Sequence, residues 1–255
     1  MSEHAESGQE GFLSHLVELR DRLIKAIVAV VIVFTVLFIY PGASTIYDFL
    51  AQPMLATLPE GTRMIATGVI TPFMVPVKVT MLAAFVIALP FVLYQMWAFV
   101  APGLYRHEKR LALPLIISSS LLFLMGMAFC YFVVFQTVFK FIASFAPQSI
   151  TPAPDIEAYL NFVLTMFLAF GITFEVPIAV ILMVRMGIVT VQKLRESRGY
   201  VVVGAFIIAA VVTPPDVVSQ FMLAVPLCLL YEVGILLASR IKPVEKNEDP
   251  EETMV

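Results

Sequence analysis

The sequence is short of charge, cysteine and histidine, and each shortage narrows the class of protein. Charged residues make up 14% of the 255 positions and hydrophobic residues 60%, whereas soluble domains average about 25% and about 45–50%. The two cysteines and three histidines offer neither a disulfide framework nor the spacing of a metal site. The net charge is −3, without a basic stripe among aromatics, so no nucleic-acid partner is expected. The apolar excess instead indicates a bilayer as the solvent.

Catalytic patterns are also missing. There is no HExxH motif and no pair of intramembrane aspartates, and His4, His15 and His107 all lie outside the apolar runs, far from Ser118–Ser120. A hydrolase would need such groups close together. We therefore expect no enzyme activity, catalytic residue, metal or cofactor, and we interpret the triple serine as a site of close helix packing.

Long apolar runs without alternation are what the sequence does contain, and they favour helices over barrel strands of ~10 residues with a period of two. Each run is bounded by proline, glycine or charge, as helix ends are. We predict an all-α integral membrane protein with a cytoplasmic N-terminal segment at 1–21 and a polar, acid-rich tail at 239–255 that we expect to be disordered. The six predicted transmembrane helices cover residues 22–41, 73–100, 111–139, 158–185, 200–212 and 217–238.

Basic residues gather in alternate connections, and this bias predicts the orientation because cytoplasmic loops retain lysine and arginine. Of the 16 basic residues, only Arg63, Lys78 and Lys140 fall on the side predicted to be exported. We therefore expect both termini in the cytoplasm. The other basic residues lie in the N-terminal segment, the second and fourth connections and the tail: Arg20, Arg22, Lys25, Arg106, Lys109, Arg110, Arg185, Lys193, Arg195, Arg198, Arg240, Lys242 and Lys246.

The fifth and sixth predicted helices are expected to be short. Residues 200–212 would form roughly 20 Å of helix, less than the ~30 Å hydrocarbon layer. The TPPD sequence at 213–216 leaves room only for a tight turn. Such a pair either thins the bilayer or is sheltered by neighbouring helices, and simple packing inside the bundle is an equally good interpretation.

Two carboxylates are predicted at the cytoplasmic ends of the first three helices. Glu18 lies in the amphipathic segment GFLSHLVELRDRLIK, which we expect along the membrane interface, and Glu108 lies in APGLYRHEKR. Glu18 is four residues before Arg22, so an intrahelical ion pair is one explanation for it, and Glu108 would also complement the dipole of the third helix. Alternatively, two carboxylates at one rim would each bind a guanidinium in a bidentate geometry that lysine reproduces less well.

A third carboxylate, Glu175, lies within the apolar run FLAFGITFEVPIAVILM. It is ten residues before Arg185, about 15 Å along a helix, so we expect it near the bilayer centre, where an ionised group without a partner costs on the order of 3 kcal/mol. It should therefore face a partner, water, or another helix of the chain through a hydrogen bond, for example to Ser118–Ser120. Pro177 and Gly171 predict a bend at this depth.

Six collinear stretches from about residue 12 to residue 240 resemble one family: HLVELRDRL, IATGVITPFMVPVK, LPFVLYQMWAFVAPGLYRHEKR, SSSLLFLMGMAFCYFVVF, FGITFEVPIA and VGAFIIAAVVTPPDVVSQ. They are similar to the TatC family, the large receptor subunit of the twin-arginine protein translocase. The resemblance implies a cup-shaped bundle of six helices in the bacterial inner membrane. It also implies that the chain binds the paired arginines in signal peptides of folded export cargo and nucleates an export complex driven by the proton-motive force.

The resemblance assigns roles to seven residues. Glu18 and Glu108 are implied as signal-peptide ligands, with Arg20 and Phe99 as further members of that cytoplasmic site. Glu175 is implied on the concave face, where small single-span subunits of the TatA and TatB type would reach it. Pro53 and Asp216 are implied on the exported side, Asp216 in contact with another subunit of a homo-oligomer within the complex. Gly68 departs from the family pattern, which often has an acid there, so it receives no role.

A different class of function also fits the residues. In a proton-coupled secondary transporter of a small solute, Glu175 would carry the proton and Lys78 or Arg185 would gate it. The purified chain alone in liposomes would then accumulate a solute under a pH gradient. The absence of a convincing internal repeat weakens this interpretation, because many transporters are built from repeats.

Overall fold

The structure is a computed structural model that describes residues 3–58, 63–100, 109–145, 147 and 153–240. The chain forms two compact units, residues 1–172 and 173–255. Most of the tail expected to be disordered, 241–255, lies outside the described residues, as does Glu108. The elements of the first unit are α1 (Glu3–Leu37), η1 (Phe38–Gly42), α2 (Ala43–Leu55), α3 (Thr71–Val100), α5 (Lys109–Phe129), η2 (Cys130–Val134), α6 (Phe135–Phe145) and most of α7 (Ile156–Phe174).

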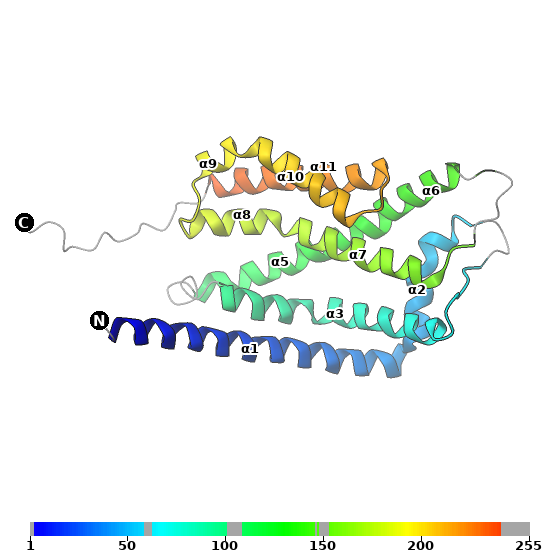
Figure 1. The fold of residues 1–255 in the computed structure, drawn as a ribbon, viewed down its shortest axis with the longest axis horizontal. Coiled ribbons are helices and arrows are strands. Elements are labelled where there is room, and N and C mark those ends of the chain that lie inside the picture. The colour runs from blue at the N-terminus through cyan, green and yellow to red at the C-terminus, as the bar shows by residue number, and fades with distance from the viewer. Residues whose placement is uncertain (1–2, 59–62, 101–108, 146, 148–152, 241–255) are drawn as a thin grey trace, which may run out of the picture. The chain divides into compact units, whose positions relative to one another are not determined.

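The second unit contains the end of α7 and four further helices. They are α8 (Val176–Arg185), α9 (Val191–Glu196), α10 (Arg198–Val212) and α11 (Val217–Ala238). The α10 and α11 helices form an antiparallel hairpin (Figure 1). No strand occurs in the part of the chain that the structure describes, so the predicted all-α fold class is confirmed.

Five helical stretches among the described residues are long and apolar enough to cross a membrane, and α10 is a shorter apolar helix. With 15 residues, α10 is about 22 Å long, which agrees with the prediction of a short fifth helix. The prediction of a short sixth helix is wrong, because α11 has 22 residues and reaches about 33 Å. The bounds of α11 coincide with the predicted range 217–238, so only the description of this helix as short is incorrect.

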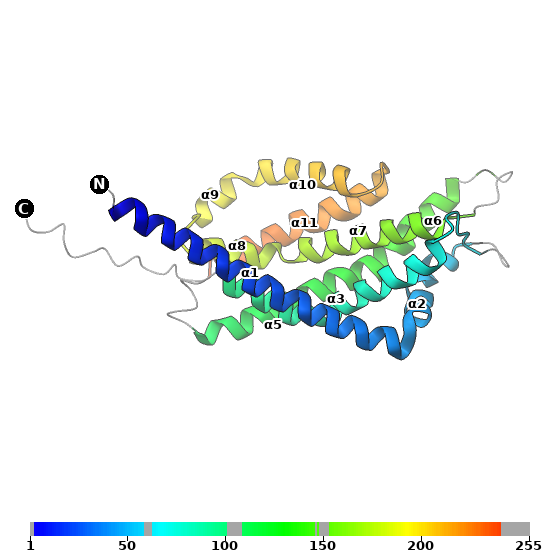
Figure 2. The same ribbon diagram turned by 60° about the horizontal axis from the view of Figure 1, so that its bottom comes forward.

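The first helix is longer than the apolar run that predicts it. α1 extends from Glu3 through the predicted amphipathic segment into the apolar region without interruption. It packs side by side with α3, and the two run in opposite directions (Figures 1 and 2). The chain then turns sharply at η1, where Tyr40 has extended backbone angles and Gly42 has φ +94°. This positive φ suits glycine because a Cβ atom would be strained there.

A cluster of aromatic side chains of α6 and α7 forms part of the core of the first unit. Phe135 is fully buried, and its ring centroid lies 5.3 Å from that of Phe167 and 5.6 Å from that of Phe139. Gly171 on α7 is in close contact with the Phe123 ring on α5, so that a Cβ atom at this position would overlap the ring. Pairs of aromatic rings at these distances contribute stability beyond their buried area.

The second unit packs α8 against α11 through a small residue. An added Cβ on Gly234 would lie 3.0 Å from both the Pro177 Cα and the Val180 Cβ atoms, so the glycine permits close approach of the two helices. The Tyr231 hydroxyl donates to the Leu194 carbonyl at 2.9 Å and thereby fixes α9 to α11. The buried residues of this cluster are Val180, Val184, Leu194, Tyr231, Ile235 and Ala238.

Candidate binding sites

Glu18 is positioned on α1 by the ion pair that its spacing predicts. The Arg22 guanidinium donates to Glu18 Oε1 from both Nε, at 2.9 Å, and Nη2, at 2.6 Å. The Glu18 side chain remains 40% exposed, and its second oxygen, Oε2, accepts no hydrogen bond from the described residues. Exposed pairs of this spacing stabilise a helix by only about 0.3–0.5 kcal/mol. Arg22 therefore orients the carboxylate, while Oε2 remains available to a further donor.

Arg20 does not contact Glu18. Its guanidinium donates to Asp21 Oδ1 from Nε at 3.0 Å and from Nη2 at 2.9 Å, and both side chains are at least half exposed. The adjacent residues neutralise each other locally. Arg20 and Glu18 thus share a short segment of one helix, and their predicted joint membership of a site rests on that proximity alone.

Phe99 lies in the last turn of α3 and is half-buried. Two residues earlier, the buried Trp97 donates its indole N–H to the Ser119 hydroxyl on α5 at 3.0 Å. The bond joins the two helices that flank the connection containing Glu108. Since α1 and α3 are antiparallel neighbours, Glu18 and Phe99 lie toward the same end of this pair. We call this end, with the N-terminal half of α1 and the C-terminus of α3, the inner end.

Pro53 explains an unusual contact at the opposite end of the first unit. Pro53 lies buried inside α2 and has no N–H to donate to the carbonyl four residues earlier. That carbonyl belongs to Phe49, and it accepts a hydrogen bond from the Tyr131 hydroxyl at 2.9 Å. The next carbonyl, that of Leu50, accepts from the Tyr159 hydroxyl at 2.8 Å. Two tyrosines of neighbouring helices therefore hold α2 in place, one of them replacing the bond that proline removes.

A network of bonds that we call the clasp joins residues 65–78 to the start of α7. Ile65 N–H donates to the Pro154 carbonyl at 3.0 Å, and Ile156 N–H donates back to the Ile65 carbonyl at 2.9 Å. Asp155 Oδ2 accepts from both the hydroxyl (2.7 Å) and the backbone N–H (3.1 Å) of Thr67. Its Oδ1 caps α7 by accepting from the backbone N–H groups of Glu157 and Ala158.

The hydrogen bonds of the clasp favour the ionised form of Asp155. They lower the pKa of its carboxyl from 3.8 to about 2, with the Ala158 N–H as the largest cause, followed by the Thr67 hydroxyl. The neighbouring Glu157 accepts from Lys78 Nζ at 3.0 Å and from the Thr71 hydroxyl at 3.1 Å. Lys78 is thus engaged in holding α3 to α7. The clasp, together with α2, marks what we call the cap end of the first unit.

In the second unit, Glu175 stands between two helices. α7 ends at Phe174, and α8 begins at Val176 with Pro177 in its first turn. Because Pro177 cannot donate a hydrogen bond to the Thr173 carbonyl, the helix is interrupted at the position where the sequence predicts a bend. Glu175 is partly exposed, and its carbonyl accepts from Ala179 N–H at 3.0 Å.

Asp216 begins α11 as a helix cap. Its Oδ1 accepts from the Ser219 backbone N–H at 2.7 Å, which satisfies one of the free N–H groups at a helix start. Its second oxygen, Oδ2, and the Ser219 hydroxyl are buried without a hydrogen-bond partner among the described residues. Asp216 therefore has a local structural task in addition to any contact with another subunit.

Several contacts were not expected from the sequence. Glu232, for example, pairs with Arg198 at 2.6 Å and ties α10 to α11. The clasp and the two tyrosine bonds join positions about 80–110 residues apart, and such partners are not encoded by local spacing. One local signal was available: proline inside a short helix always leaves a carbonyl without its usual donor.

These features define an all-helical, multi-pass membrane protein. Residues 14–226 match the family model of the Sec-independent protein translocase protein TatC. The chain is 49% identical to the TatC protein of Haemophilus influenzae, covering 94% of this chain and 96% of that one. It is 47% identical to the Escherichia coli K12 protein, covering 89% and 87%.

The similarity extends to proteins of other lengths and to solved structures. The chain is 51% identical to the TatC protein of Halothiobacillus neapolitanus over 91% of its own length, but it spans only 63% of that longer protein. A crystal structure of the twin-arginine translocase receptor TatC superposes with a TM-score of 0.76 at 39% identity, covering 89% of this chain and 98% of that one. A second structure, crystallised in DDM, gives a TM-score of 0.78 at 38% identity, with 88% and 99% covered. The chain belongs to the TatC family.

Proposed function

We propose that this chain is the subunit of the twin-arginine translocase that binds the paired arginines of signal peptides at its inner end. The observation that carries the proposal is the state of Glu18: one carboxylate oxygen is oriented by Arg22, and the other accepts no hydrogen bond from the described residues. An incoming guanidinium can bind Oε2 directly and compete for Oε1. The cost of displacing Arg22 is small, about 0.3–0.5 kcal/mol.

Arginine is favoured over lysine at such a carboxylate for a geometric reason. A guanidinium presents two parallel N–H groups that match the two oxygens of a carboxylate, whereas an ammonium is a point charge. We assign the first arginine-binding carboxylate to Glu18 and the second to Glu108. Phe99 would supply apolar contact beside them, and Arg20 would help to shape the site while neutralised by Asp21.

Assembly is assigned to three other positions. Glu175, at the interruption between α7 and α8, is proposed to receive a polar residue of a small single-span subunit of the TatA or TatB type. Pro53 acts by leaving the Phe49 carbonyl free to accept from Tyr131, which holds α2 in place. Asp216 contributes to contact with a second copy of the chain at the exported side. We infer that the chain lies in the bacterial inner membrane with both termini in the cytoplasm. It would act by binding and scaffolding, with the proton-motive force as the energy source and no covalent chemistry.

The proposal is tested by cross-linking signal peptides to membranes that contain the full chain. The peptides differ only in an arginine pair or a lysine pair, so their charge is the same. The arginine peptide is expected to label the chain at least tenfold more strongly. Equal labelling of the two peptides would remove the recognition hypothesis, because simple charge attraction would then explain binding.

The secondary-transporter alternative is not favoured. Lys78, one of its two possible gates, donates to the Glu157 carboxylate, which also accepts from the Thr71 hydroxyl. The lysine is therefore part of the clasp. The relatives and solved structures are moreover named as translocase proteins.

A further inference from the structure

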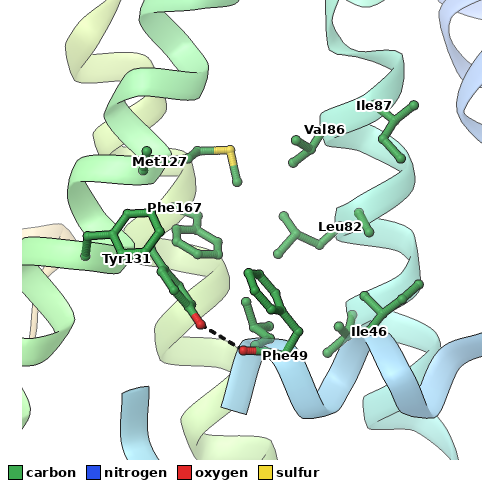
Figure 3. A pocket seen from close by; sticks show the side chains of 13 residues that line it. Ile46, Phe49, Leu82, Val86, Ile87, Met127, Tyr131 and Phe167 are labelled. Atoms are coloured by element: carbon green, nitrogen blue, oxygen red, sulfur yellow. Dashed lines mark hydrogen bonds between the residues drawn. The ribbon is translucent and has the colours of Figure 1, made fainter. Parts of the chain in front are cut away.

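An apolar groove lies at the cap end of the first unit, where α2, α3 and η2 come together (Figure 3). Its volume is about 310 Å³. Ile46 and Phe49 from α2, Leu82 and Val86 from α3, and Met127 from α5 point into a common space. The remaining lining residues are Leu50, Val79, Ala83, Ile87, Ala128, Tyr131, Phe132 and Phe167.

Water is a poor occupant of this groove. A buried water molecule needs two to four polar partners, and every lining side chain is apolar except Tyr131. The Tyr131 hydroxyl already donates to the Phe49 carbonyl (Figure 3). Apolar cavities of comparable size remain dry and accept apolar molecules.

The lining of the groove is elongated along α3. On α3 it follows Val79, Leu82, Ala83, Val86 and Ile87, a single helical face that extends about 12 Å along the axis. This shape fits an extended hydrocarbon chain better than one inserted side chain.

The groove opens onto the surface that faces lipid. Phe49, Ile87 and Phe132 at its rim are 58%, 57% and 60% exposed, and α3 and the α5–η2–α6 helix both belong to stretches apolar and long enough to span a membrane. The apolar lining is therefore continuous with the lipid contact surface of these helices. An empty groove would lose the dispersion contacts of its walls, so hydrocarbon from the bilayer should fill it.

We propose that this groove binds one acyl chain of a membrane phospholipid. The bound chain contacts Ile46, Phe49 and Leu50, and so it acts as an additional support of α2 beside the two tyrosine bonds. Because a ligand that binds only the folded form stabilises it, removal of lipid should loosen α2 first. The site is separate from the inner end and does not depend on the function proposed there.

The first test maps lipid contacts on the full chain in phosphatidylethanolamine and phosphatidylglycerol vesicles. A trace phospholipid carries a photoreactive diazirine in the middle of one acyl chain, and labelled positions are read by mass spectrometry. Ile87 and Phe132 should be labelled at least fivefold more than Leu121, which is equally exposed at 59% but does not line the groove. Equal labelling of the three positions would overturn the proposal, because exposure to bulk lipid would explain it.

The second test fills the groove. Ala128→Leu and Ala83→Leu add three carbon atoms from opposite walls, and Ala143→Leu is the matched control, because Ala143 is exposed on α6 outside the groove. Each groove variant should reduce labelling of Ile87 and Phe132 at least fivefold, and the control should not. If one groove variant fails to fold, the other and the wild-type map decide the question. Unchanged labelling in a folded groove variant would refute the site.

A third test separates lipid from a protein occupant. A photoreactive amino acid at Ile87 is activated in native membranes that contain the partner subunits. A phospholipid adduct supports the proposal, whereas a protein adduct without a lipid adduct shows that a partner fills the groove and overturns it.

Discussion

The inner end and the cap end of the first unit hold their charged residues in different ways. At the inner end, Glu18 pairs with a residue one helical turn away, and Arg20 pairs with its neighbour. At the cap end, Asp155 and Glu157 bind residues about 80–90 positions distant in sequence, reinforced by backbone bonds of Ile65. Local pairs leave helices free to present their carboxylates to a ligand, whereas long-range bonds fix helices to one another. The difference is in keeping with the proposal of a receptive inner end, and it marks the cap end as the rigid one.

The largest effect is expected from Glu18→Gln. If this variant kept its affinity for the peptide, the inner end would not differ from the cap end in the way proposed. Loss of a charge-assisted hydrogen bond costs about 1.5–3 kcal/mol, so the affinity for an arginine-pair peptide should fall at least tenfold. Asp21→Asn is the matched control, since Asp21 is an acid on the same helix paired with Arg20. Both variants should retain the helical circular dichroism of the wild type. Equal losses of affinity in the two variants would mean that general charge, not a site at Glu18, attracts the peptide.

The next effect concerns the support of α2 at the rigid end. Tyr131→Phe should lower the free energy of unfolding by about 0.5–1.5 kcal/mol, the usual net value of one hydrogen bond. In a Pro53→Ala background the cost should be smaller, because residue 53 again supplies an N–H for the Phe49 carbonyl. Denaturation of the four proteins in one detergent measures this coupling. Additive costs would show that proline and tyrosine act independently.

The clasp should make the rigid end sensitive to acid. The pKa of the Asp155 carboxyl is about 2 in the folded chain, below its ordinary 3.8. Its contribution to stability is therefore complete above about pH 4 and is lost as the pH falls toward 2. The protection factors of residues 65–67 and 155–158, which correct hydrogen exchange for its intrinsic pH dependence, should fall across this window in the wild type. Asp155→Asn should show lower protection factors at pH 5 and a weaker change across the window; identical profiles would exclude the clasp as the cause.

The smallest effect on peptide affinity is expected from Arg22→Gln at the inner end. Arg22→Gln removes the competitor for Glu18 Oε1, so peptide affinity should rise about twofold, corresponding to 0.3–0.5 kcal/mol. Titration of a fluorescent arginine-pair peptide measures the change, and Lys25→Gln serves as a control that removes a nearby charge without freeing Glu18. Weaker binding in Arg22→Gln than in the control would show that Arg22 belongs to the site itself.

Much of the fold could be predicted because long apolar runs favour helices with few alternatives in a bilayer. The Glu18–Arg22 pair and the interruption at Glu175 were also predictable, since both follow from local spacing or a nearby proline. The predicted range 217–238 of the sixth helix matches α11, and the wrong expectation of a short helix came only from its pairing with the short α10. The bond of Glu157 to Lys78 could not be predicted, because it depends on how α3 and α7 pack, which no local pattern encodes. The groove depends on the wide turn η2, for which the sequence CYFVV has no clear signature.

The turn η2 affects how the sequences of related chains align with this one. η2 is a single π-helical turn between α5 and α6, and such a turn contains one residue more than an α-helical turn would need. A relative that lacks one residue between positions 130 and 134 would close this turn as a regular α-helical turn, so both flanking helices would keep their faces while the residues within the turn shift. A one-residue gap in an alignment at this point should therefore mark chains in which the position of Tyr131 shifts relative to α2 and the groove wall at 131–132 changes.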